Sequence, residues 1–193
     1  MGLVTLKDLL ATSIEEKYAV GGFVTFDYAS TEAIIKAAEK TGGKAIVMVP
    51  WGMIAERERR DEYLAITADM IRNSSADIAL HLDHGANFEE VMLAIHAGFS
   101  SVMYDGSALP FDENIANTKK VVEAAHACGV SVEGEIGHVG GAEGGALISG
   151  GLTADSSMYT TVEEAVKFYE ETGVDALAVA FGTVHGIVKG TPK

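Results

Sequence analysis

The 193-residue sequence contains a single cysteine, Cys128, and this scarcity limits both its covalent chemistry and its compartment. One cysteine permits no internal disulfide, so a reducing cytoplasm is the expected setting. Cys128 stands in the run AHACGV and is predicted to be a small core residue at the end of a helix. No neighbouring base or positive cluster marks it as a reactive thiol.

Positive charge is also scarce, because 14 lysines and arginines stand against 28 aspartates and glutamates and the net charge is −14. This balance argues against partners such as nucleic acid or an anionic membrane, where positive charge dominates affinity. A phosphorylated ligand would have to be held locally, by a metal ion, by backbone N–H groups in glycine-rich loops or by a few placed cations.

Long apolar runs are missing as well, since none reaches the roughly 18 residues that cross a bilayer. The first 18 residues mix acids and bases in helical order and lack the apolar stretch of a signal peptide. No Pro-rich or Ser-rich linker interrupts the chain, so residues 1–193 are predicted to form a single domain.

The chain instead alternates short apolar runs with longer amphipathic stretches. Bounded apolar runs are typical of buried parallel strands. The stretches between them begin with capping-box patterns and end at glycines, as helices do. This repeat predicts a parallel α/β fold, with a helix over residues 5–16 that covers the floor of the sheet. The predicted strands are 19–26, 44–49, 77–82, 100–104, 130–136 and 175–181.

Ionisable side chains follow four of these strands, and their spread separates two parallel architectures. A doubly wound open sheet gathers its ligands at one switch point, on two or three strand ends. In a (β/α)8 barrel every strand ends at one shared mouth. The spread therefore favours a TIM barrel of which about six βα units are present. The four motifs are HLDHG (81–85), YDGS (104–107), EGEIG (133–137) and GTVHG (182–186).

Three side chains in these motifs suggest a metal site. His84, His185 and Glu135 form the mixed nitrogen and oxygen set that suits catalytic zinc with an exchangeable position. The alternative is a pair of hydrogen-bonded barrel histidines with rim acids in ion pairs. That alternative suits any one residue alone, whereas four strand ends together favour the metal.

The strand that ends at HLDHG places its polar residues at different depths. Alternation puts His81 and Asp83 on one face, whereas His84 is expected to begin the loop and fold over the opening. His81 lies one layer deeper and is expected to be structural, as a supporting partner of the site.

The same motifs, in the same order, resemble the signatures of class II fructose-bisphosphate and tagatose-bisphosphate aldolases. The resemblance is dense from about residue 75 to 193 and includes the run 101–107 and GGAE at 140–143. It implies a zinc-dependent lyase of carbohydrate metabolism (glycolysis) that cleaves a ketose bisphosphate reversibly. The products would be dihydroxyacetone phosphate and glyceraldehyde 3-phosphate, formed through a zinc-stabilised enediolate.

The resemblance implies which side chains hold metal. His84 and His185 correspond to zinc ligands, and Glu135 corresponds to a carboxylate at the metal. Asp105 and Glu133 correspond to positions near a secondary site, which would take a second divalent or a monovalent cation.

Catalytic and phosphate contacts follow from the same resemblance. Asp83 corresponds to the acid/base for the hydroxyl at the carbon that becomes the aldehyde. Glu143, in a glycine-rich loop, corresponds to the group that exchanges the proton on the nucleophilic carbon. Gly186 and Lys189 fall in the loop that contacts phosphate and a monovalent cation. A cytoplasmic homodimer or homotetramer is the expected assembly.

The sequence departs from the family pattern in three places. The first strand ends in Phe26-Asp27 where the family has Phe-Asn, and the second ends in Pro50-Trp51 where the family has a polar pair. Residues 57–60 contain three arginines, which are expected to lie on a solvated helix face rather than to bind phosphate. Family members also continue through two more βα units, which hold a third zinc histidine. The 193 residues alone are therefore expected to be a fragment that binds zinc poorly and turns over little substrate.

Three other functions remain open at this point. A class I aldolase would use a Schiff-base lysine, for which Lys189 is the candidate, although it lies beyond the strand end. A degenerate barrel would bind a sugar phosphate or a partner protein without turnover. A related metal-dependent lyase would act on another keto-sugar phosphate.

Overall fold

The computed structural model describes residues 2–137 and 159–182, and its centre is one curved parallel sheet. The strand order is β2-β3-β4-β5-β6-β7, and each neighbouring pair is parallel and consecutive in sequence. Sequential parallel strands joined by helices are the arrangement of a partial TIM barrel. The strands are β1 (Gly2–Leu3), β2 (Gly22–Val24), β3 (Lys44–Pro50), β4 (Asp77–Gly85), β5 (Ser101–Tyr104), β6 (Ser131–Ile136) and β7 (Ala176–Val179).

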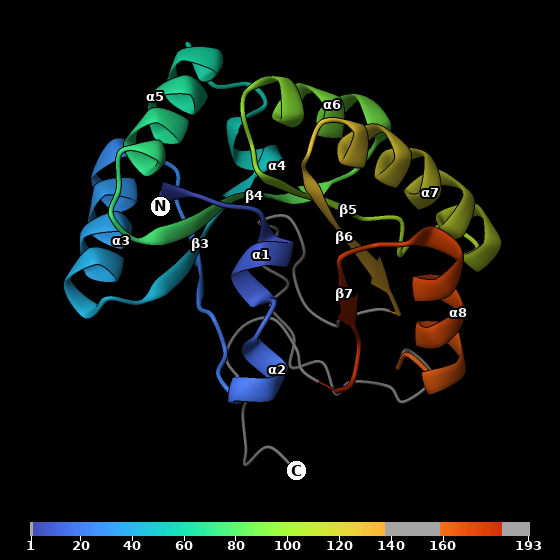
Figure 1. The fold of residues 1–193 in the computed structure, drawn as a ribbon. Helices are drawn as coiled ribbons and strands as arrows, with labels where there is room; N and C mark the ends of the chain where they lie inside the picture. Colours follow the sequence, from blue (N-terminus) through green and yellow to red (C-terminus); the bar gives the residue numbers. More distant parts are fainter. Residues whose placement is uncertain (1, 138–158, 183–193) are drawn as a thin grey trace.

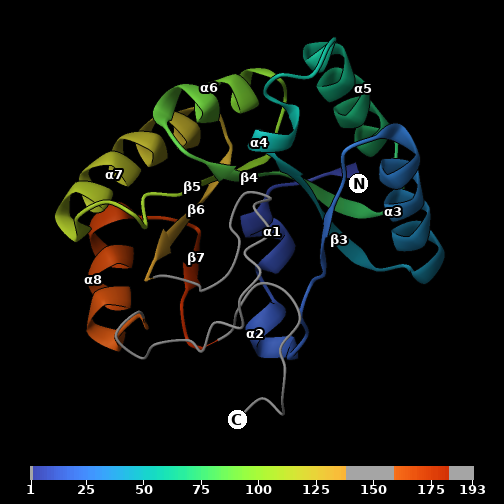
Figure 2. The ribbon, with the colours of Figure 1, turned by 180° about the vertical axis from the view of Figure 1, so that it is seen from behind.

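Most of the helices lie along one side of this sheet. Figure 1 shows α3 and α5 to α8 following the curve of the strands, with α1 and α2 on the opposite side, and Figure 2 shows the same arrangement from behind. The helices are α1 (Leu6–Leu10), α2 (Ser13–Glu16), α3 (Tyr28–Thr41), α4 (Trp51–Ile54), α5 (Arg60–Arg72), α6 (Phe88–His96), α7 (Phe111–Ala127) and α8 (Val162–Thr172).

The six predicted strands are confirmed, and their bounds differ from the prediction most at two of them. Strand β2 is shorter than the predicted 19–26 and is exposed along its length, whereas β4 runs three residues beyond the predicted 77–82. The short strand β1, which pairs with the start of β4, was not predicted. Cys128 is exposed beyond the end of α7, so the expectation of a core residue is wrong. As the C-cap, Cys128 lies past Ala125, the last residue of α7 that is buried.

The core lies between the sheet and the outer helices. Val47 of β3 and Leu80 and Leu82 of β4 are fully buried against residues from the helices. At the β6 position Gly134, an added Cβ would lie 2.7 Å from the ring of Phe168 in α8. The lack of a side chain there lets α8 pack directly on the strand.

The N-terminal segment lies at the opposite end of the sheet from the polar motifs. The helix expected over residues 5–16 is divided into α1 and α2. The Leu6 N–H donates to Ser131 Oγ at the start of β6 over 3.0 Å, and Lys44 Nζ at the start of β3 donates to the Leu9 carbonyl over 3.1 Å. These contacts tie α1 to the amino-terminal ends of two strands, β3 and β6.

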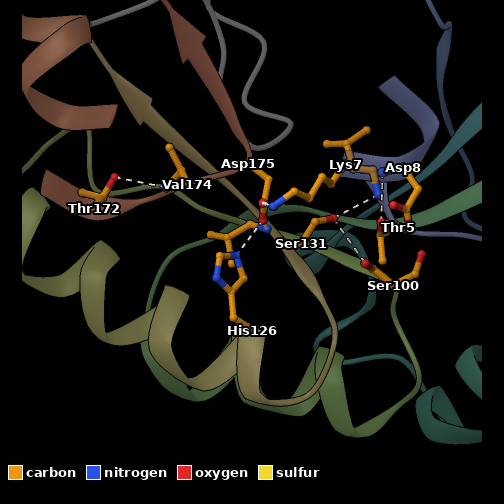
Figure 3. A network of polar contacts seen from close by, with 11 residues as sticks. Thr5, Lys7, Asp8, Ser100, His126, Ser131, Thr172, Val174 and Asp175 are labelled. Atoms are coloured by element: carbon orange, nitrogen blue, oxygen red, sulfur yellow. Dashed lines mark hydrogen bonds and ion pairs between the residues drawn. The ribbon is translucent and has the colours of Figure 1, made fainter. Parts of the chain in front are cut away.

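Asp175, just before β7, is the centre of a polar network at this end (Figure 3). Its carboxylate accepts hydrogen bonds from His126 Nε2 over 2.7 Å and from the Val132 N–H over 2.9 Å. Lys7 Nζ of α1 lies 3.0 Å from the other carboxylate oxygen. The Asp175 side chain is only 3% exposed, so this one residue joins α1, α7 and β6 below the sheet.

Across the described ranges, no helix is both long enough and apolar enough to cross a membrane.

Candidate metal centre

Strand β4 carries an extra residue where Asp83 and His84 lie. Leu82 pairs with Val102 and Gly85 with Tyr104, so three steps along β4 match two along β5. His84 has a φ of 53°, in the left-handed region that few non-glycine residues adopt. A bulge of this kind re-aims side chains beside it.

The bulge brings two neighbouring side chains to the same side of the sheet. His84 Nε2 lies 3.9 Å from Asp83 Oδ1, although adjacent residues of a regular strand point to opposite faces. His84 therefore belongs to the strand. The expectation that it begins the loop is wrong. Backbone strain at functional residues is common, because the surrounding fold stabilises it.

Side chains from three neighbouring strands meet at this bulge. His84 Nδ1 is 3.0 Å from Asp105 Oδ2 and 3.8 Å from Glu135 Oε2. One potential ligand atom from each residue lies within 4.8 Å of the others, which is close enough to surround one cation. Glu135 is almost fully buried, and the other two side chains are partly exposed at the mouth.

Neighbouring groups hold the Asp105 carboxylate and the Glu135 backbone in place. Asp105 Oδ1 accepts hydrogen bonds from the backbone N–H and the hydroxyl of Ser107, at 3.0 and 2.7 Å. The Asn114 side chain in α7 donates to the Glu135 carbonyl over 2.8 Å. A Cβ at Gly106 would lie 2.2 Å from Asn114 Oδ1, so glycine is needed for this close approach.

The charges of the cluster are strongly coupled. The hydrogen bond that His84 donates to Asp105 raises the pKa of His84 to about 9 against the opposing effect of burial, and the Asp83 and Glu135 charges add to the increase. Burial raises the pKa of Asp105, but hydrogen bonds from His84 and Ser107 outweigh it and lower the pKa to about 2. The cluster is therefore rich in negative charge, which suits a divalent cation.

A second polar layer lies beneath this cluster. His81 is 2% exposed, and its Nδ1 lies 2.8 Å from Ser101 Oγ while its Nε2 lies 3.3 Å from Glu133 Oε2. When Ser101 donates to Nδ1, Nε2–H donates to Glu133. His81 thus connects strands β4, β5 and β6 one layer below the metal candidates.

The predicted site residues fall into three groups. Asp83, His84, Asp105 and Glu135 lie together, and Asp105 contacts His84 directly. Glu133 pairs with His81 in the deeper layer. The remaining four lie outside the described residues, and their roles stay predictions: Glu143, His185, Gly186 and Lys189.

Sequence reasoning missed two supporting residues. Ser107 was visible only as part of the motif after β5, and Asn114 as a polar residue in the first turn of a helix. A fully buried asparagine in an amphipathic helix is a usable signal, because buried amides require partners.

Comparison with known proteins places the chain in a family. The sequence profile described as "Fructose-bisphosphate aldolase class-II" matches residues 4–193, which include every motif discussed above. The chain belongs to the class II fructose-bisphosphate aldolase family.

Individual relatives of this class II aldolase chain agree with the family assignment. It is 41% identical over 195 residues to a fructose-bisphosphate aldolase of Staphylococcus aureus (strain Mu50), and 42% identical to a "Probable fructose-bisphosphate aldolase" of Bacillus subtilis (strain 168). Both matches cover 100% of this chain and 66% of the relative, so the chain spans slightly less than two thirds of their length. The crystal structure of the YdjI aldolase from Escherichia coli K12 superposes with a TM-score of 0.81 at 28% identity, covering 95% of this chain and 64% of that one.

Proposed function

We propose that the protein is a zinc-dependent ketose-bisphosphate aldolase that cleaves fructose- or tagatose-1,6-bisphosphate to dihydroxyacetone phosphate and glyceraldehyde 3-phosphate. The observation that carries this proposal is the meeting of His84, Asp105 and Glu135 at one point, beside Asp83. His84 and Glu135 offer one imidazole and one carboxylate that fit zinc, and Asp105 orients the imidazole. We further propose that His185 completes this set, and that the protein acts in the cytoplasm as a homodimer or homotetramer.

Asp105 supports the imidazole rather than acting alone. When His84 Nδ1–H donates to Asp105, the lone pair of His84 lies on Nε2, which is the nitrogen left to bind the ion. Glu135, almost fully buried on β6, presents its carboxylate from the next strand but one. Glu133 and a second cation would then belong to the deeper layer with His81.

The reaction requires a base and an electron acceptor. A zinc ion held at this site would supply a Lewis acid for the ketone oxygen. Asp83 takes the proton from the substrate hydroxyl, and that oxygen forms the aldehyde C=O as the adjacent carbon–carbon bond breaks. The electron pair of the broken bond forms a double bond between the carbon next to the ketone and the ketone carbon, and the ketone oxygen takes up the negative charge. Glu143 then donates a proton to the carbon next to the ketone, which restores the ketone in the product.

The test combines zinc content with release of triose phosphate from both bisphosphates. We expect EDTA to abolish the release, His84→Ala to lose zinc, and Asp83→Asn to keep zinc but lower the release by at least about 100-fold. The 193-residue chain alone is expected to bind zinc weakly, so zinc is supplied in excess. Trapping of substrate on the protein by borohydride, or unchanged zinc content in His84→Ala, would contradict the proposal.

A further inference from the structure

Asn114 is a polar side chain on the buried, largely apolar face of α7. It lies in the first turn of this helix and is only 2% exposed. Its buried neighbours on the same helix include Ile115, Val121 and Val122. Burial of an amide is unfavourable unless its donors and its acceptor find partners, so the position of Asn114 in this core calls for a physical reason.

The Asn114 amide takes part in two hydrogen bonds, and these fix the way it points. Its Nδ2 donates to the Glu135 carbonyl over 2.8 Å, and the Thr118 hydroxyl donates to its Oδ1 over 3.0 Å. A carbonyl can only accept, so the NH2 group must face Glu135. Thr118 lies one turn further along α7 and is fully buried, so it holds the amide from the helix side.

The same amide packs against the backbone of Gly106. A Cβ on Gly106 would be 2.2 Å from Asn114 Oδ1 and 2.7 Å from its Cγ, so a larger residue would displace the amide. Gly106 directly follows Asp105 in the chain. One side chain of α7 therefore contacts both Glu135 and the residue next to Asp105.

These contacts lie where the pairing of β5 with β6 stops. The register of the two strands ends at Tyr104 and Gly134, so Asp105 and Glu135 come one residue beyond the last pair. Hydrogen bonds of a parallel ladder fix the spacing of the residues within it. Past the end of this ladder, the amide of Asn114 connects the two chain segments.

The two segments carry groups that converge on the candidate ion. Asp105 Oδ2 lies 3.0 Å from His84 Nδ1, and Glu135 Oε2 lies 3.8 Å from the same nitrogen. Distances from a metal ion to its ligands stay within about 0.2 Å of their preferred values, so a shift of one segment against the other would weaken binding of the ion.

We propose that Asn114 is a positioning residue of the metal centre, which sets the separation between the Asp105–His84 pair and Glu135. Asn114 acts through the backbone of Gly106 and Glu135 and needs no contact with ion or substrate. The inference rests on the proposed function for the identity of the ion, but the positions of the protein groups require neither metal nor turnover.

The first measurement uses the metal-free protein, in which NMR of isotope-labelled histidine reports the ring nitrogens of His84 at one fixed pH. Asn114→Ala should shift these signals, because Asp105 moves relative to the imidazole. Val121→Ala is the matched control, since it truncates another fully buried side chain two turns further along the same helix. It should lower stability and leave the His84 signals in place.

The second measurement titrates Co²⁺, a spectroscopic substitute for zinc, into the same proteins. Asn114→Ala should weaken Co²⁺ binding about 10-fold or more, the range for residues that support metal ligands, and should change the visible absorption of the bound ion. Val121→Ala should match the unmodified protein in both. A residue that only stabilised the fold would change affinity and spectrum no more than this control does.

Gly106→Ala tests the same contact from the opposite side and does not depend on the folding of an Asn114 variant. Its added Cβ displaces the amide and should also shift the His84 signals. When Gly106→Ala and Asn114→Ala are combined, the smaller side chain at position 114 leaves room for the new methyl group. The pair should therefore weaken Co²⁺ binding by less than the product of the two separate effects.

Each other result overturns the proposal or the proposed function. Unshifted His84 signals in Asn114→Ala or in Gly106→Ala would overturn the role of Asn114, as would unchanged Co²⁺ affinity and absorption in Asn114→Ala. Equal changes in Val121→Ala, or a combined effect equal to the product, would make Asn114 a packing residue only. An unmodified protein that binds no Co²⁺ would count against the proposed function alone, because the metal-free signals still decide the role of Asn114.

Discussion

Asp175→Ala should destabilise the protein far more than its distance from the mouth suggests. Removal of the carboxylate leaves the buried Val132 N–H without its acceptor, which costs about 1.5–3 kcal/mol for a hydrogen bond to a charged group. The contacts with His126 and Lys7 are 39% and 69% exposed on the partner side, so together they add about 1 kcal/mol after solvent screening. We expect the free energy of unfolding to fall by about 3 kcal/mol.

Urea unfolding followed by circular dichroism measures this loss, with Lys7→Ala as the control that removes only the exposed arm. Lys7→Ala should cost less than about 1 kcal/mol. Burial raises the pKa of Asp175, but hydrogen bonds from Val132 and His126 lower it overall. The stabilisation is therefore present above the unfolded pKa of about 3.9 and is lost as pH falls through the lower folded value. The reasoning fails if Asp175→Ala lowers the free energy of unfolding no more than Lys7→Ala does. It also fails if the unmodified protein and Asp175→Ala lose stability equally as pH falls.

Two further outcomes follow from the site and the core. Because the pKa of His84 is raised to about 9, its charge stabilises the metal-free protein fully below the unfolded value of about 6.5, and this is lost as pH rises through 9. Zinc must displace that proton, so calorimetry in two buffers at pH 7.5 should find release of about one proton, and a value near zero would contradict the assignment. Gly134→Ala places a Cβ 2.7 Å from Phe168 and should cost about 1–3 kcal/mol in thermal denaturation. Gly52→Ala, whose Cβ meets nothing within 4 Å, is the control and should be neutral or stabilising.

The sheet could be predicted because its strands are bounded apolar runs whose buried residues dominate the pattern. Strand β3 shows this, since burial alternates along the predicted run. The single extra residue in β4 could not be predicted, because a bulge leaves no hydropathy signal and depends on pairing with β5. His84 was consequently placed in the loop.

The candidate site was predictable in residue type and only partly in geometry. Glycines and polar residues after four strands indicated one mouth, but the contact of Asp105 with His84 depends on side-chain directions that a sequence does not contain. Arg57 shows the same limit, because a charged run resembles a solvated helix until its packing on Tyr63 is known.

The attachment of α1 to both β3 and β6 also affects the order in which the chain acquires structure. The Leu6–Ser131 hydrogen bond joins residues 125 positions apart, so it forms only after the intervening strands have paired. Contacts between such distant residues slow folding, because the long loop must close before they contribute. During synthesis the first helix must wait for β6 to leave the ribosome, and until then its apolar residues Leu6 and Leu9 are open to chaperones or to other nascent chains.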